Sequence, residues 1–192
     1  MVVSERASFA LAEQLRGPHG AAVADVFSFL SGLYFRGKLA YARAFARPPV
    51  GLLGAMVITS SRGLVGVDDR ITVACMREFA AVPIDLDEPR YRDPLTRDAE
   101  RLARRSGPDC EFVLLGSVAT PKYVAVLAGA CGERLRFPAA FVGRGDMSRG
   151  GLMLRCVADG RELEYVPIGD GPRRGSRPPK LAPRRLTATV IG

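Results

Sequence analysis

The stretch EFVLLGSVATPKYVAVLAGAC, residues 111–131, decides the fold class of this chain. Residues 111–116 are mostly apolar and end at a glycine, which is typical of a buried strand. Thr120 and Pro121 then open a helix that we expect to reach about Cys131, because proline is favoured at the first helical position. A strand that leads directly into a helix is the repeating unit of an α/β fold.

The chain before this stretch shows the same alternation. Residues 51–59 and 82–86 are short apolar runs that predict two further strands. Between the second of these and residue 111, Asp93 serves as the expected cap of a helix, with Pro94 at its first position. Strands and helices in this order predict a three-layer sandwich around a mixed, partly parallel sheet.

The chain after residue 131 has a different pattern. Residues 134–142, 152–158 and 162–168 alternate or run apolar, so we expect antiparallel strands that extend the sheet. Residues 158–161, Ala-Asp-Gly-Arg, have the composition of a hairpin turn between the last two of them.

The beginning of the chain is predicted to be helical. Ser4 can cap a first helix that runs to about residue 15, and a second helical stretch extends from Ala21 to Phe45. The Pro48-Pro49 pair ends it, because proline lacks the backbone donor and restricts the residue before it.

These patterns predict one domain followed by a basic tail. The domain covers residues 1–168, with a helical segment at 1–47 and the sheet core at 51–168. Residues 169–192 are rich in proline and carry six basic side chains against Asp170, a charge of +5 out of the formal +8 of the chain. We expect this tail to be flexible until about residue 186 and to favour nucleic acid or an acidic protein partner.

The same sequence argues against export and membrane insertion. Glu5 and Arg6 interrupt residues 1–15, where a secretory signal would need an apolar run. The longest apolar stretch, 21–35, contains Asp25 and is short for a bilayer. We therefore expect a soluble protein of the reducing cytoplasm without a membrane partner.

Cysteine and histidine usage excludes several kinds of chemistry. The four cysteines lie far apart in apolar segments without a histidine nearby, which favours buried thiols over a zinc site. They are Cys75, Cys110, Cys131 and Cys156. His19 is the only histidine, so histidine-based triads and the H-E-x-x-H metalloprotease motif are excluded.

The turn after the strand at 111–116 is a candidate anion site. Free backbone donors at the start of the following helix attract anions, and Ser117, Thr120 and Lys122 could add ligands. The pattern of a P-loop is missing. The alternative is an ordinary connection between a strand and a helix.

Residues 143–151, GRGDMSRGG, form the second candidate. The glycines would let the backbone approach a ligand, while Arg144 and Arg149 could grip phosphate or carboxylate. Asp146 could act as a general base or hold a sugar hydroxyl, beside Ser148. A merely mobile hairpin is the alternative.

Residues 59–64 follow another buried strand, at the kind of edge where open sheets bind ligands, and bring Ser61 and Arg62. Asp85 and Asp87 follow the next predicted strand and could share a magnesium ion or contact a ribose. Capping and turn formation are the alternative explanation of these two carboxylates. Apart from magnesium at Asp85 and Asp87, we expect no cofactor.

A fourth candidate is the aromatic and basic stretch 33–43. Helical spacing places Tyr34, Lys38 and Tyr41 near one another, where they could stack on and grip a nucleic-acid strand. The alternative is an amphipathic helix packed on the sheet with its arginines outward.

The segments ITSSRGLV, 58–65, and EFVLLGSVATPKYVAVL, 111–127, together resemble uncharacterised bacterial α/β domains. Those domains are related in appearance to the uracil-DNA-glycosylase-like domain of archaeosine synthases. In them a strand ending in serine, a small or basic residue and Gly-Leu precedes a helix, and a later strand leads into a helix with Lys-Tyr. The resemblance implies the sheet architecture and a preference for bases or nucleotides, without a particular reaction.

The sequence thus predicts a protein that binds a nucleotide or a nucleic acid at the carboxyl ends of its strands. As an enzyme it would act on a base or an N-glycosidic bond, with Asp146 and Ser148 as catalytic residues. The alternatives are a non-catalytic RNA- or DNA-binding protein, and an interaction subunit whose tail binds an acidic partner. The expected ligand-binding residues are Ser61, Arg62, Ser117, Thr120, Lys122, Arg144 and Arg149.

Overall fold

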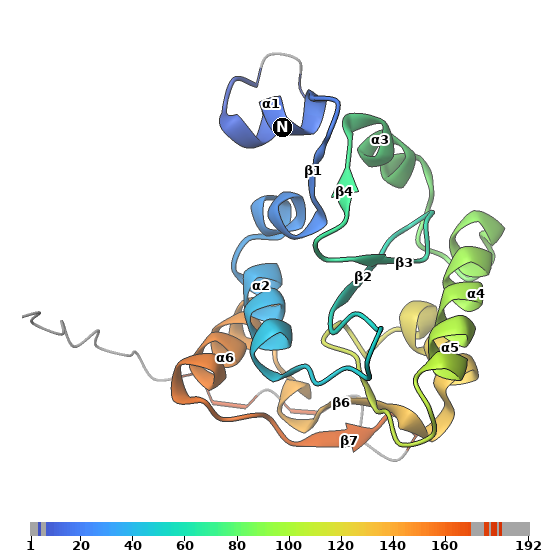
Figure 1. The fold of residues 1–192 in the computed structure, drawn as a ribbon. Helices are drawn as coiled ribbons and strands as arrows, with labels where there is room; N and C mark the ends of the chain where they lie inside the picture. Colours follow the sequence, from blue (N-terminus) through green and yellow to red (C-terminus); the bar gives the residue numbers. More distant parts are fainter. Residues whose placement is uncertain (1–3, 5–6, 170–174, 177, 180, 182–192) are drawn as a thin grey trace, which may run out of the picture.

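In the part of the chain that the structure describes, the strands form three small sheets (Figure 1). The computed structural model describes residues 4, 7–169, 175–176, 178–179 and 181. Strands β1 (Ala21–Ala22) and β4 (Arg70–Ile71) form one antiparallel pair, and β2 (Met56–Ile58) and β3 (Leu64–Gly66) form another. In the third sheet β5 (Phe112–Val113) is parallel to β6 (Leu135–Pro138), which is antiparallel to β7 (Tyr165–Pro167).

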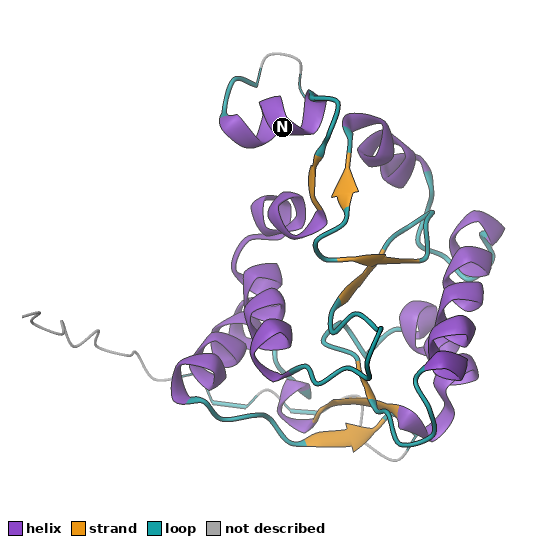
Figure 2. Ribbon diagram, viewed as in Figure 1, coloured by secondary structure: helices purple, strands orange, loops and turns teal. Residues whose placement is uncertain are grey.

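Most of the regular structure is helical, as Figure 2 shows. The helices are α1 (Ala10–Arg16), α2 (Val23–Phe45), α3 (Val73–Ala81), α4 (Pro89–Arg105), α5 (Pro121–Cys131) and α6 (Asp146–Asp159), with short 3-10 turns η1 (Gly132–Arg134) and η2 (Ala139–Phe141). Helix α2 packs along α6, and α4 packs along α5 on the other side of the molecule (Figure 1).

The structure confirms the mixed α/β character and several of the expected elements. Helix α5 begins at Pro121 and ends at Cys131 as predicted. Helix α2 ends at Phe45, before the two prolines, and contains one break at Gly32, whose φ of 55° and ψ of −135° are not helical. The parallel pair β5–β6 and the antiparallel pair β6–β7 match the expected mixed pairing. The three-layer sandwich stays a prediction, because the described strands are divided among three sheets.

The prediction of a strand at 152–158 is wrong, and so is the prediction of a hairpin turn at 158–161. Both lie in or at the end of α6, where Arg149, Met153 and Cys156 are buried at helical spacing. Gly160 ends this helix in the left-handed conformation, and its N–H bonds to the Cys156 carbonyl. A glycine after an aspartate suits either a hairpin or a helix end, and packing against α2 selects the helix.

Other boundaries also differ from those expected. Helix α4 begins at Pro89 instead of Pro94, because the Glu88 carboxylate accepts a hydrogen bond from the Arg90 backbone and caps the helix one turn earlier. Residues 82–86 form a bend and a turn, not a strand. Ser4 does not cap α1, which begins at Ala10.

Three apolar clusters form the core. The largest joins α4, α5 and the β5–β6–β7 sheet around side chains such as Tyr91, Leu95 and Phe137. A second joins α1, the first half of α2 and the strands beside it, and a third lies between α2 and α6 around Tyr41, Phe141 and Met153.

The prediction of buried thiols is confirmed for three of the four cysteines. Cys75, Cys131 and Cys156 are buried, and Cys110 is half-buried. Burial raises the pKa of the Cys131 thiol to about 11, which keeps it protonated and unreactive at neutral pH.

Two glycines allow α2 and α6 to cross in close contact. A Cβ atom at Gly37 would lie 2.7 Å from the carbonyl oxygen of Gly150, and one at Gly150 would lie 2.8 Å from the carbonyl oxygen of Leu33. No side chain fits between backbones at such a distance. This contact fixes the positions of Lys38, which follows Gly37, and of Arg149, which precedes Gly150, relative to the other helix.

Within the described ranges, no helix combines the length and the hydropathy needed to cross a membrane. The predictions for the basic tail fall almost entirely outside the described residues. Of the residues after Gly169, the structure describes only 175–176, 178–179 and 181.

Candidate functional site

Lys38 occupies an unusual position on α2. It is half-buried, and its ammonium lies 3.9 Å from the centroid of the Tyr34 ring. Among the described residues, the structure gives this ammonium no hydrogen bond and no ion pair. Burial lowers the pKa of Lys38 to about 8, with Arg149 acting in the same direction and Asp146 opposing it. Lys38 is therefore a cation whose lost hydration is replaced mainly by an aromatic face.

Arg149 reaches the same place from α6. Its Nε donates to the Phe141 carbonyl over 3.2 Å, and its guanidinium lies 5.5 Å from the Phe141 ring centroid. Its nearest carboxylate, on Asp146, is 3.8 Å away. The Asp146 side chain is 67% exposed while that of Arg149 is 10% exposed, so water weakens the compensation of the buried charge.

Tyr34 connects these two cations to the end of strand β5. Its hydroxyl donates to the carbonyl oxygen of Leu115 over 3.1 Å. Burial raises the pKa of the hydroxyl, Arg149 opposes this rise, and Tyr123 of α5 adds to it. We call Tyr34, Lys38, Asp146 and Arg149 the α2–α6 site; it combines two poorly compensated cations with one exposed carboxylate.

The turn predicted to bind an anion borders this site. The Leu115 carbonyl accepts the hydrogen bond from Tyr34. Tyr123 lies near enough to Tyr34 to influence the pKa of the Tyr34 hydroxyl. The first turn of α5 is held in place because the Tyr91 hydroxyl donates to the Lys122 carbonyl over 2.7 Å. The ammonium of Lys122 lies 5.5 Å from the centroid of the Tyr123 ring.

The two hydroxyl residues of this turn have different positions. Thr120 is exposed at the N-cap of α5, and its side chain makes no capping hydrogen bond. Ser117 is half-buried between β5 and the helix. The structure therefore brings the turn at 115–122 beside the stretch predicted at 33–43, through the hydrogen bond from Tyr34 to Leu115.

The prediction of a loop or hairpin between two strands at 143–151 is wrong, because most of this segment belongs to α6. Gly145 is the N-cap of α6, and the helix begins at Asp146. The glycine-rich composition has a structural cause at Gly150, which contacts α2, and at Gly143, whose φ is 70°. Asp146 and Arg149 are three residues apart in the first turn of α6, so their side chains lie on the same face of the helix. Both influence the pKa of Lys38 on α2.

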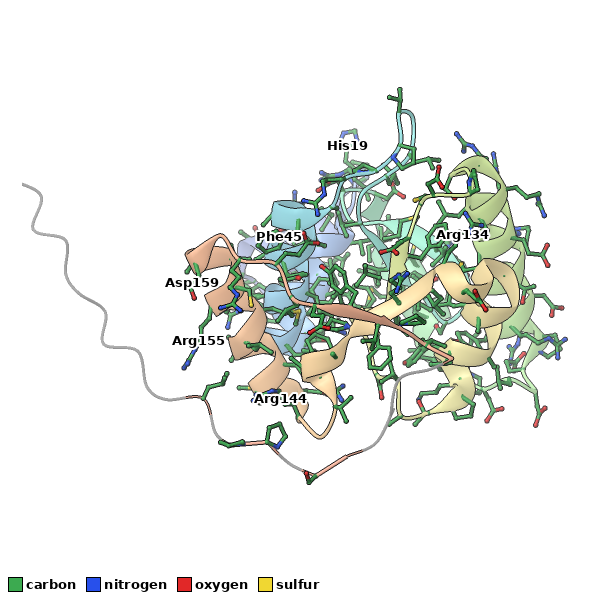
Figure 3. All side chains as sticks on the ribbon, turned by 90° about the horizontal axis from the view of Figure 1, so that it is seen from below. His19, Phe45, Arg134, Arg144, Arg155 and Asp159 are labelled. Carbon is green, nitrogen blue, oxygen red and sulfur yellow. The ribbon has the colours of Figure 1, made fainter. Side chains whose placement is uncertain are left out.

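Arg144 and Ser148 interact with each other. Arg144 donates from Nη1 to the Ser148 hydroxyl over 3.2 Å, and from Nε to the Ala140 carbonyl over 2.9 Å. It also donates to the Pro179 carbonyl over 3.5 Å, and Figure 3 shows it next to this part of the C-terminal segment. In this structure Arg144 connects the backbone at Ala140 with the backbone at Pro179.

The residues predicted at 59–64 are satisfied within the fold. Ser61 donates to the Glu78 carboxylate over 2.7 Å, and Arg62 forms an ion pair with the same carboxylate at 2.6 Å. Thr59 donates to the Gly63 carbonyl over 3.1 Å and closes the turn between β2 and β3. These contacts lead to α3, and the structure does not join them to the α2–α6 site.

Asp85 and Asp87 form a local turn. The Asp85 carboxylate accepts a hydrogen bond from the Asp87 backbone N–H over 3.0 Å, as in the turn that the sequence allowed as an alternative. No group of three or more metal-ligating side chains is found among the residues that the structure describes. The magnesium site stays a prediction.

Two surface hollows lie away from the α2–α6 site. One of about 220 Å³ is lined by Arg43, Asp68 and neighbouring residues, and the side chains of Arg43 and Asp68 form an ion pair at 2.6 Å. Another of about 390 Å³ lies between the end of α1 and the start of α3, beside Arg16 and Arg77. Neither hollow is lined by a residue of the α2–α6 site.

Sequence reasoning assigned Lys38 and Tyr34 only to a nucleic-acid-binding helix and missed Tyr123. One signal could have directed attention to Lys38. The chain contains 25 arginines and three lysines, Lys38, Lys122 and Lys180. Both lysines that the structure describes lie on tyrosine rings at or beside the α2–α6 site.

Comparison of the chain with known protein families, with curated proteins and with solved structures finds no match.

Proposed function

We propose that the α2–α6 site binds a phosphate-bearing ligand, a nucleotide or a nucleic-acid strand. The observation that carries the proposal is the half-buried ammonium of Lys38 close to the buried guanidinium of Arg149, with the exposed Asp146 as the carboxylate that the described residues place beside them. Buried charge that lacks a partner is costly, and a bound anion would remove that cost.

The surroundings of the two cations support a nucleotide in particular. The Tyr34 ring contacts the Lys38 ammonium, Tyr123 lies near enough to Tyr34 to influence its pKa, and aromatic rings stack on bases. The uncapped first turn of α5 adds backbone donors near Lys122. As an enzyme the protein would act on a base or an N-glycosidic bond, with Asp146 orienting water or a sugar hydroxyl.

A second candidate is a nucleic-acid-binding protein without catalysis. The charge of +5 in residues 169–192 favours it, because each phosphate contact with a basic side chain releases a counterion. Under this candidate, the α2–α6 site would hold one nucleotide of a longer strand.

Ligand titration against three variants tests the proposal. A nucleoside triphosphate and a fluorescein-labelled single-stranded oligonucleotide serve as probes. Lys38→Met and Arg149→Lys should weaken binding by about ten-fold or more, the scale of a lost charge-assisted hydrogen bond. Arg36→Met is the matched control, since Arg36 is an exposed cation on the same helix as Lys38.

Thermal melting of each variant separates lost binding from lost folding. The proposal is wrong if Lys38→Met and Arg149→Lys fold and bind both probes as tightly as the parent. It is also wrong if Arg36→Met weakens binding as much as they do, because binding would then depend on overall charge.

A further inference from the structure

We infer that the Lys38 amine forms an imine with the aldehyde carbon of a phosphorylated sugar held at the α2–α6 site. The sugar would be either a free sugar phosphate or a nucleotide of a strand that has lost its base. This inference rests on the proposed function, because the phosphate would be held by Arg149. It adds the chemical class of the substrate and a covalent role for one residue.

The position of Lys38 suits a nucleophile better than a structural cation. Several other cations of this protein have a carboxylate partner: Arg43 pairs with Asp68, Arg62 with Glu78, and Arg47 with Glu162. Lys38 contacts the Tyr34 ring at 3.9 Å, and the described residues offer it no hydrogen bond or ion pair. Its nitrogen is therefore not occupied by an acceptor that a substrate would have to displace.

The choice of lysine at position 38 points in the same direction. A guanidinium does not lose its proton at physiological pH, whereas an amine does, and only the neutral amine can attack a carbonyl. The chain uses arginine at 25 positions and lysine at three. Burial also lowers the pKa of Lys38 to about 8, so a substantial fraction of the amine is neutral near physiological pH.

Arg149 and Asp146 supply the remaining parts of the reaction. The buried guanidinium of Arg149 would hold the phosphate of the sugar, which places the aldehyde near the neighbouring amine. Asp146 influences the ionisation of Lys38, and it is exposed enough to exchange protons with water. It is therefore the group that we expect to carry protons between the amine and the solvent.

The step balances without any further reagent. The amine lone pair forms a bond to the aldehyde carbon, while the carbonyl oxygen gains a proton and the nitrogen loses one, which gives a carbinolamine. Loss of the hydroxyl group as water then forms the carbon–nitrogen double bond. Amine and aldehyde thus become imine and water, with no change in oxidation state.

Borohydride trapping tests the inference on the full chain. Borohydride delivers hydride to an imine and converts it into a stable secondary amine, which mass spectrometry then locates. One arm uses a single-stranded oligonucleotide with an abasic site, and the other uses deoxyribose 5-phosphate. Trapping in the first arm alone identifies a strand without its base as the substrate, and trapping in the second alone identifies a free sugar phosphate.

Two lysine-to-arginine variants make the experiment specific. Lys38→Arg keeps the charge and should lower the trapped fraction at least about ten-fold. Lys180→Arg is the matched control that should be trapped like the parent, and the peptide that carries the adduct should contain Lys38. An adduct on another lysine or on the amino terminus, or equal trapping of Lys38→Arg, overturns the inference.

Binding of an oligonucleotide with a tetrahydrofuran residue separates the inference from the proposed function. This residue lacks the aldehyde, so it reports binding alone. If it binds with the dependence on Lys38 and Arg149 described above but neither aldehyde is trapped, the imine is wrong and the binding site stands. If neither the strands nor the sugar phosphate bind, both proposals fail.

Discussion

The turn between β2 and β3 and the α2–α6 site both combine a side-chain hydroxyl, an arginine and a carboxylate, yet they differ in how their charges are balanced. In the turn, Arg62 and Ser61 share the Glu78 carboxylate. In the α2–α6 site, Lys38 lies on an aromatic ring and Arg149 faces a carboxylate that is mostly in water.

This difference shows how a structural polar cluster is distinguished from a candidate site. In the turn, the polar side chains of Ser61 and Arg62 are satisfied by the Glu78 carboxylate. This ion pair is exposed and therefore contributes little stability. In the α2–α6 site the described residues give the buried guanidinium of Arg149 only a mostly exposed carboxylate at 3.8 Å, and the Lys38 ammonium only an aromatic ring; under our proposal a bound anion completes this charge balance. Residue types alone do not separate the two regions, because both are basic and polar.

The largest effect is expected where α2 and α6 touch. Gly37→Ala would place a methyl group 2.7 Å from the Gly150 carbonyl oxygen and should lower the free energy of unfolding by about 2–3 kcal/mol. Gly129→Ala is the matched control in α5, where no atom lies within 4 Å of the added carbon, and should raise stability by about 0.5–1 kcal/mol. Urea denaturation measures both, and equal midpoints for Gly37→Ala and the parent would contradict the close crossing.

The next effect concerns the charge of Lys38. The folded protein binds its proton less tightly than the unfolded chain, so the pKa rises on unfolding from about 8 toward its ordinary 10.5. Between these values the unfolded state holds more protons, so raising the pH favours folding. The parent should gain on the order of 2 kcal/mol relative to Lys38→Met between pH 8 and about pH 10.

Denaturation of the parent and of Lys38→Met across this range measures that gain. Other groups titrate there too, including Cys131 and the tyrosines, but they are common to both proteins and cancel in the difference. Arg36→Met, which removes an exposed cation, should show a constant difference from the parent. A constant difference for Lys38→Met as well would mean that Lys38 is fully hydrated.

A smaller effect is expected for the hydroxyl of Tyr34. Tyr34→Phe removes the hydrogen bond to the Leu115 carbonyl at 3.1 Å and should cost about 1 kcal/mol of stability. Tyr123→Phe is the control, because its hydroxyl makes no hydrogen bond among the described residues, and should stay within about 0.5 kcal/mol of the parent. Thermal melting distinguishes them, and a larger loss for Tyr123→Phe would contradict the assignment.

The smallest effect is expected in the turn. Arg62 and Glu78 are 48% and 40% exposed, so Arg62→Ala should change stability by about 0.5 kcal/mol or less. Its affinity for the nucleotide and oligonucleotide probes should equal that of the parent. A loss of affinity as large as that of Lys38→Met would place the turn in the binding site and remove the distinction drawn between the two regions.

The sequence by itself determined the elements whose signals are local. Pro121 after Thr120 marked the start of α5, and the Pro48-Pro49 pair marked the end of α2. These predictions succeed because proline acts on its own backbone and that of its neighbours, whatever the rest of the chain does. The pairing of Tyr34 with Lys38 also follows from helical spacing alone.

Only the tertiary structure decided which of the candidate regions meet. The segment at 143–151 looked like a loop because its glycines suit a turn, but Gly150 is needed where α6 touches Gly37 of α2. That contact, together with the hydrogen bond from Tyr34 to Leu115, joins three stretches that are far apart in the sequence. Burial and charge compensation depend on such distant neighbours, so no local pattern could show that Lys38 and Arg149 remain incompletely paired while Arg62 is satisfied.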